Sequence, residues 1–149
     1  MMFPNLKTRL NIIVEIIRGK TTIKVNEAET WVIRITVANF SHNEINNIIV
    51  KNNILNNETT VEDYLVNEGN LDDKKTRQTI WRIKTVAPDT TAVFDITLYG
   101  AFLIPGYTFL DSGVATADGI DSIHFNDAGI YVEESSRIPT RGMDLFASY

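Results

Sequence analysis

The 149-residue sequence predicts an all-β protein folded as an antiparallel β-sandwich. Isoleucine, valine and threonine are used heavily, and β-branched side chains fit a pleated, half-buried surface better than a helix. Apolar and polar residues alternate with a period of two in several segments, and no segment shows a sustained helical stripe. These observations together favour a fold made of strands.

The alternation is clearest in residues 30–39 (TWVIRITVAN), 79–86 (TIWRIKTV) and 91–102 (TAVFDITLYGAF). One set of alternate positions is apolar in each segment, which is typical of a strand with one face on a core. The side chains that we expect inside are Trp31, Ile33, Ile35 and Val37, then Trp81 and Ile83, and then Ala92, Phe94, Ile96 and Leu98.

The other predicted strands are residues 10–17, 22–25, 45–54, 107–115, 120–125 and 130–133, with turn residues between them. Residues 58–73 are acidic with Gly69-Asn70 in their middle, and we predict an exposed connection there. The strand count is then about seven to nine, which indicates an immunoglobulin-like sandwich.

The domain organisation follows from this pattern and from the chain length, which suits one domain. We predict a sandwich at residues 10–134 between an N-terminal arm, residues 1–9, and a C-terminal arm, residues 135–149. Each arm carries isolated apolar residues among polar ones, and we expect these residues to contact a neighbouring subunit. They are Phe3, Leu6, Leu145, Phe146 and Tyr149.

Composition excludes several classes of partner and site. The net charge of -5 gives no basic footprint for phosphates, so we expect no nucleic-acid binding. The longest apolar stretches are far shorter than the ~20 residues of a spanning helix, so we expect no membrane insertion. The chain has no cysteine, which excludes disulfides and thiolate sites. No signal peptide is recognisable at the N-terminus.

Four motifs in residues 25–102 carry a family resemblance. They are Asn26–Trp31 (NEAETW), Ile33–Asn39 (IRITVAN), Ile45–Lys51 (INNIIVK), and Trp81–Ile83 (WRI) followed by Val86–Ala92 (VAPDTTA). In this order the motifs resemble a bacterial surface-repeat domain, the family called domain of unknown function eleven. Asp89 stands where that family usually has glycine.

The resemblance implies an immunoglobulin-like packing or spacer module of the cell envelope, of a kind that also occurs in spore appendages. We therefore expect a bacterial surface protein, on a spore surface or in an extracellular filament. Spore-surface proteins are assembled inside the mother cell, which agrees with the lack of a recognisable leader.

The candidate metal ligands are the C-terminal aspartates Asp111, Asp118, Asp121 and Asp127. Calcium binds several carboxylate and carbonyl oxygens from flexible loops, so these residues are calcium candidates. Aspartate beside glycine or asparagine also stabilises turns, and this second interpretation is the one that we favour. We expect no resident metal or other cofactor.

Histidine and tryptophan offer the remaining candidates for a site. His42 and His124 have no cysteine partner, and no glycine-flanked serine predicts a nucleophile elbow. We therefore expect no catalytic residue and no enzyme. Trp31 and Trp81 are candidates for a sugar-stacking platform, although their place in the alternation favours core packing.

Three functions remain open at this stage. The first is a self-assembling structural subunit whose partner is itself, joined through the arms or the sheet edges. The alternatives are a sandwich module that binds carbohydrate or another surface ligand, and a phage structural protein.

Overall fold

The computed structural model describes residues 9–72 and 77–134, which form twelve strands. Their bounds are β1 (Leu10–Arg18), β2 (Thr22–Lys24), β3 (Glu29–Asn39), β4 (Ile45–Ile54), β5 (Thr59–Val66), β6 (Asn70–Asp72), β7 (Gln78–Val86), β8 (Thr91–Gly100), β9 (Gly106–Phe109), β10 (Asp111–Ala117), β11 (Ile120–Phe125) and β12 (Gly129–Glu133). Within these ranges there is no helix that is long and apolar enough to span a membrane.

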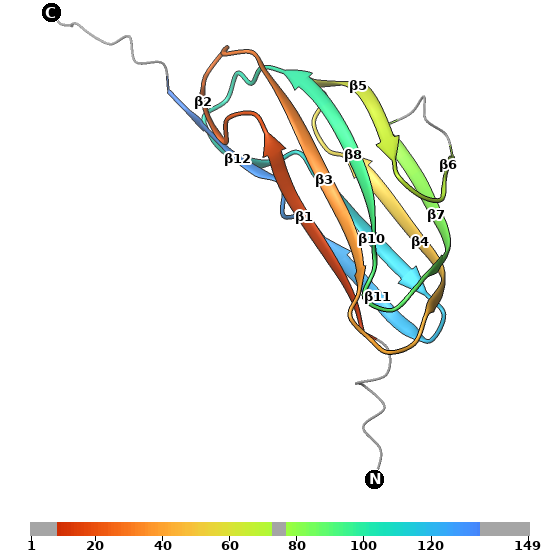
Figure 1. Cartoon of the computed structure of the whole chain (residues 1–149). Coiled ribbons are helices and arrows are strands. Elements are labelled where there is room, and N and C mark those ends of the chain that lie inside the picture. The colour runs from red at the N-terminus through yellow and green to blue at the C-terminus, as the bar shows by residue number, and fades with distance from the viewer. Residues whose placement is uncertain (1–8, 73–76, 135–149) are drawn as a thin grey trace, which may run out of the picture.

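The strands form two facing layers and a small end sheet (Figure 1). One layer has the strand order β1-β3-β8-β5, and the other has the order β11-β10-β4-β7-β6. The end sheet, β2-β12-β9, contains the parallel pair β2 and β12, whereas the other described pairings are antiparallel. This arrangement confirms the all-β, immunoglobulin-like sandwich predicted from the sequence.

The core lies between the two layers. The alternating apolar side chains of β3 and β8 fill it from one side, and those of β4 and β7 fill it from the other. Trp81 and Phe94 meet across the layers with ring centroids 5.5 Å apart. Both tryptophans are fully buried, which confirms the prediction that they pack in the core.

Each tryptophan also fixes a chain corner in the same way. The indole N–H donates to a carbonyl beside a glycine of positive φ, where a Cβ would collide with backbone. The two bonds are Trp31 Nε1 to the Lys20 oxygen (2.7 Å), beside Gly19 (φ +99°), and Trp81 Nε1 to the Glu68 oxygen (2.8 Å), beside Gly69 (φ +85°). The polar end of a buried indole is thereby satisfied.

The loop after β3 is organised by Asn39, the last residue of the Ile33–Asn39 motif. Its buried side chain donates to the backbone oxygens of Asn43 (2.8 Å) and Val86 (2.9 Å), and its Oδ1 accepts from the Ser41 N–H (2.9 Å). Asp89 donates its own backbone N–H to the Asn39 oxygen and has a φ of +58°. This left-handed conformation favours glycine, although aspartate tolerates it.

Two local predictions differ from the structure. Residues 58–73, predicted as an exposed connection, contain β5 and β6. A register shift between Val61 and Asp63 changes which residues face the core, so the alternation in β5 is broken. The segment 107–115, predicted as one strand, is divided at Leu110 between β9 of the end sheet and β10 of the main layer.

Candidate interaction surfaces

The four aspartates proposed as calcium ligands lie at two separate places. Asp111 begins β10 and Asp118 follows its last residue. A strand rises about 3.3 Å per residue, so these two aspartates lie at opposite ends of β10. Asp118 accepts a hydrogen bond from Asn47 Nδ2 (2.6 Å) across the neighbouring turn. Asp121 is on β11, and Asp127 is exposed in the connection to β12. The fold therefore does not bring the four carboxylates to one centre.

The two histidines are both exposed, His42 in the β3–β4 connection and His124 on β11. Over residues 9–72 and 77–134, no group of three or more histidine, aspartate or glutamate side chains is placed to hold a metal ion. The described residues thus bring no such group of side chains together around either histidine.

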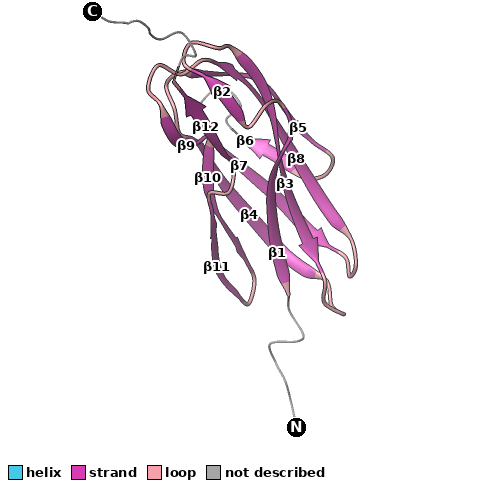
Figure 2. Cartoon of the chain, turned by 90° about the vertical axis from the view of Figure 1, so that its left-hand side faces the viewer, coloured by secondary structure: helices cyan, strands magenta, loops and turns pink. Residues whose placement is uncertain are grey.

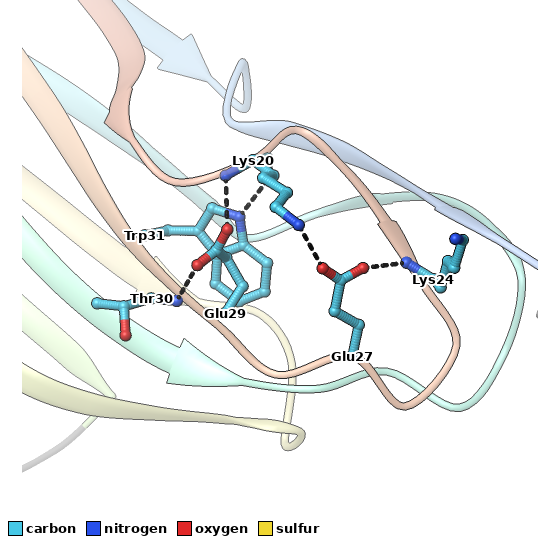
Figure 3. A network of polar contacts seen from close by, with 6 residues as sticks. All are labelled: Lys20, Lys24, Glu27, Glu29, Thr30 and Trp31. Atoms are coloured by element: carbon cyan, nitrogen blue, oxygen red, sulfur yellow. Dashed lines mark hydrogen bonds and ion pairs between the residues drawn. The ribbon is translucent and has the colours of Figure 1, made fainter.

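The acidic turn of the Asn26–Trp31 motif uses its carboxylates structurally (Figure 3). Glu29 accepts the backbone N–H groups of Lys20 and Thr30, both at 2.9 Å. Glu27 accepts the Lys20 ammonium (2.5 Å) and the Lys24 backbone N–H (2.9 Å). The pKa of Glu27 is lowered mainly by the hydrogen bond from the Lys20 ammonium. The pKa of Glu29 is lowered mainly by the hydrogen bond from the Lys20 backbone N–H. Both carboxylates therefore hold the corner between β1 and β3.

A buried polar cluster lies inside one part of the sandwich. Asn52 on β4 is opposite Thr79 on β7 and Gly113 on β10, and Asp111 is two residues from Gly113 on the same face. Asp111, Asn52 and Thr79 are each at most 1% exposed. Neither carboxylate oxygen of Asp111 has a hydrogen-bond partner among the described residues. Burial without a hydrogen-bond partner strongly disfavours the charged form of a carboxyl group.

Burial is the main cause that raises the pKa of Asp111 well above its ordinary range. The Asn52 side chain is close enough to oppose this rise in part, although the two groups do not meet hydrogen-bond geometry. Burial and the nearby Asp111 also raise the pKa of Tyr64 on β5. Burial thus favours the neutral form of Asp111, and a buried carboxyl that favours its neutral form is a poor ligand for calcium.

Several exposed apolar side chains lie on the end sheet and on the loop before it, and we call them the end patch. Tyr107 is 85% exposed and lies opposite Tyr131 across the β9–β12 ladder, with ring centroids 4.7 Å apart. The preceding loop adds Leu103 and Ile104, which are 64% and 75% exposed. The end patch consists of Leu103, Ile104, Tyr107, Phe109 and Tyr131. Exposed apolar clusters of this kind mark interaction surfaces.

The end patch is not predicted from the sequence, because its residues belong to a predicted turn and to predicted strands. A signal was nevertheless present, because leucine and isoleucine directly precede Pro105-Gly106, where turns usually carry polar residues. A groove of about 380 Å³ beside Tyr107 and Tyr131 is also lined by Thr21, Thr22 and Asp127.

The opposite end of the sandwich carries a different apolar group. β1 begins at this end, whereas β12 and the end patch lie at the other (Figures 1 and 2). Phe40, at the β3–β4 connection, is 52% exposed, and its N–H donates to the Arg9 oxygen. The predicted arm residues Phe3, Leu6, Leu145, Phe146 and Tyr149 lie outside the described residues.

Comparisons with known proteins show similarity only at the level of the fold. No family model and no curated protein sequence matches the chain. A variant of BcpA, the major pilin subunit of Bacillus cereus, is similar at 11% identity and a TM-score of 0.50; the match covers 85% of this chain and 41% of the pilin. The chain thus spans less than half of that subunit.

Two further solved structures are similar at lower TM-scores. A CARDB domain from Pyrococcus furiosus matches at 16% identity and a TM-score of 0.41, covering 91% of this chain and all of that domain. A cohesin module from Clostridium perfringens matches at 8% identity and a TM-score of 0.46, covering 87% and 99%. At such identities the similarity to BcpA supports the sandwich fold alone.

Proposed function

We propose that this chain is a non-catalytic structural subunit of a bacterial surface or spore-associated filament, and that it assembles with copies of itself. The observation that carries the proposal is the end patch, where Ile104 and Tyr107 are 75% and 85% exposed. Exposure of apolar side chains to water is unfavourable, and the free energy falls when a partner covers them. The pilin subunit BcpA has a similar fold, so the proposed role is one that this kind of sandwich can serve.

The partner in this proposal is a second copy, bound end to end. The end patch lies at one end of the long axis and Phe40 at the other, so the two ends are unlike. A contact between unlike surfaces is heterologous, and heterologous contacts continue into filaments when they do not close into rings. The predicted C-terminal arm, residues 135–149, follows β12 in the sequence, and we include it in the proposed contact.

Sedimentation velocity at increasing concentration tests the end contact. We expect the variant Ile104→Asp with Tyr107→Ser to lose the larger species, and Phe40→Ser to weaken them as well. Leu65→Ser is the matched control, because Leu65 is 62% exposed on β5 and lies opposite Asp95, in the middle of β8, away from both ends. Equal behaviour of all three variants and the wild type would contradict the end contact.

A second candidate function is carbohydrate binding at the groove beside the end patch. Tyr107 and Tyr131 supply exposed ring faces, and Asp127 and Thr22 supply polar groups beside them. Aromatic faces with a few polar groups are typical of small-ligand sites. Glycan-array binding that disappears in Tyr107→Ala would support this function, whereas an unchanged or blank array would exclude the groove as a glycan site.

A further inference from the structure

The edge strand β1 is apolar on both faces. Ile12, Val14 and Ile16 face the core but stay half-buried, because β1 is an edge strand and no strand among the described residues lies beyond it in the sheet. On the other face, Ile13 and Ile17 are 41% and 44% exposed. The strand runs in regular register from Leu10 to Ile16 before a shift between Ile16 and Arg18. A long edge strand with a regular register and few charges is a template for another strand.

The other edge strands of the described layers are protected. β5 carries Glu62 and Asp63 beside its register shift, and β11 carries Asp121 and His124. β6 has only three residues, one of them Asp72. Charges, irregularities and short length are the usual means by which proteins prevent edge pairing. β1 lacks these means over its first seven residues, apart from the single charge of Glu15.

Glu15 is the last member of a row of alternating charges on the outer face of the sheet. Arg34 on β3 binds Asp95 on β8 through two hydrogen bonds, of 2.8 and 2.9 Å. Glu15 is opposite Arg34 in the β1–β3 ladder. From β8 outward the row is therefore negative, positive, negative, and it stops at the open edge. A positive group on an added strand would continue it.

We propose that β1 pairs antiparallel with β1 of a second copy of this chain, in the register that places Glu15 opposite the second copy's Arg9. Arg9 continues the β1–β3 ladder before β1, since its backbone oxygen accepts the Phe40 N–H. Arg9 and Glu15 are an even number of positions apart, so in an extended chain their side chains lie on the same face of the sheet. The two-fold axis then passes between the Ile12 residues of the two copies, which lie opposite each other. Residues 9–15 of each copy form the pairing. Two Glu15–Arg9 pairs result, one on each side of the axis.

This pairing also completes the burial of the inner face. In the proposed register the core-facing side chains Leu10, Ile12 and Val14 of one copy lie beside those of the second copy. Together they form one continuous apolar row on the inner face of the joined sheet. Ile120 and Ile123 of β11 are likewise half-buried next to the core, and β11 is the edge strand of the facing layer. The inference goes beyond the end contact proposed above and rests on its premise that the partner is a second copy.

Charge exchange across the axis tests the register by sedimentation velocity of the full chain. We expect Glu15→Arg to raise the dimer dissociation constant about tenfold, because two attractive cross-strand pairs become repulsive. Adding Arg9→Glu to that variant should return the constant to within about threefold of wild type, because the pairs are restored in reverse. The Glu15–Arg34 contact within one chain is lost in both variants, so a merely structural role of Glu15 would give no rescue. Thermal unfolding checks that each variant is folded.

Disulfide trapping provides a second measurement in this cysteine-free chain. In the proposed register Asn11 lies opposite the second copy's Ile13, so Asn11→Cys with Ile13→Cys should form covalent dimers on oxidation. Leu65→Cys, at the exposed face of β5, is the control and should remain monomeric.

The possible outcomes separate this inference from the proposed function. Rescue by the double charge exchange and selective trapping support the β1 pairing. Larger species that persist in Glu15→Arg but disappear in the end-patch variant would overturn the β1 pairing and leave end-to-end assembly standing. A wild type that is monomeric at every concentration would overturn both.

Discussion

β1 and β5 are the two edges of the same sheet, yet they differ in the properties that control association. β1 keeps a regular register with one charge from Leu10 to Ile16, whereas β5 has two adjacent charges beside a register shift in its middle. The alternation that made β1 predictable from sequence also leaves its edge open. The charges and the bulge that protect β5 hide its strand pattern, so the same segment was predicted as a connection. Of these two edge strands, the one that the sequence predicts correctly is therefore the one whose edge is more open to pairing.

The largest expected effect concerns the packing that holds β5 and the β5–β6 connection. Trp81 fills the core against Phe94 and donates to the Glu68 oxygen. Trp81→Ala should lower the free energy of unfolding by about 3–5 kcal/mol. Urea unfolding measures the loss, and hydrogen exchange should quicken first in β5 and β6. Trp31→Ala is the matched variant, and its exchange should quicken first near β1 and β2. The same exchange pattern in both variants would contradict separate support of the two edges.

The next effect depends on pH and lies behind β5. The raised pKa of Asp111 means that the folded chain keeps this proton while the unfolded chain releases it above about pH 4. Folded stability therefore falls as pH rises above that value. Asp111→Asn should remove this loss, with a gain over wild type that grows by up to about 1.4 kcal/mol per pH unit. Unfolding curves from pH 3 to 8 measure it, and parallel wild-type and variant profiles would contradict a buried neutral acid.

A smaller effect is expected where β5 begins. The Arg77 guanidinium donates to the backbone oxygens of Asn56 and Thr59 and to the Thr59 hydroxyl. Arg77→Met keeps the aliphatic stem but removes these charge-assisted bonds, so we expect a loss of about 1–2 kcal/mol. β1 has no such contact in the described part of the chain. Lys84→Met, at an exposed position on β7, is the control and should change stability little; equal losses in both variants would contradict this role of Arg77.

Two surface substitutions should have the smallest effects on stability, yet they should separate the two edges most clearly in their effect on self-association. Ile13→Lys and Leu65→Lys both alter exposed side chains, so each should change the free energy of unfolding by less than about 0.5 kcal/mol. Sedimentation should show that only Ile13→Lys weakens self-association. If Leu65→Lys weakens it equally, β5 is an interface too and the contrast between the edges fails.

The sequence predicted the sandwich, most of its strands and the core, because alternation of apolar residues directly reflects burial. It could not place the candidate site. Aspartates close in sequence suggested one calcium centre, but β10 separates Asp111 from Asp118, and Asp111 turns inward. The end patch depends on Tyr107 meeting Tyr131, which are far apart in sequence and joined only by the β9–β12 pairing. Contacts that arise from strand order are invisible until the topology is known.

Self-assembly is tested most directly by negative-stain electron microscopy of the wild-type chain over about a hundredfold range of concentration. The apolar ends and the open β1 edge predict filaments or other particles larger than one subunit, which increase with concentration and are lost in the end-patch variant Ile104→Asp with Tyr107→Ser. Isolated monomer-sized particles at every concentration would contradict self-assembly.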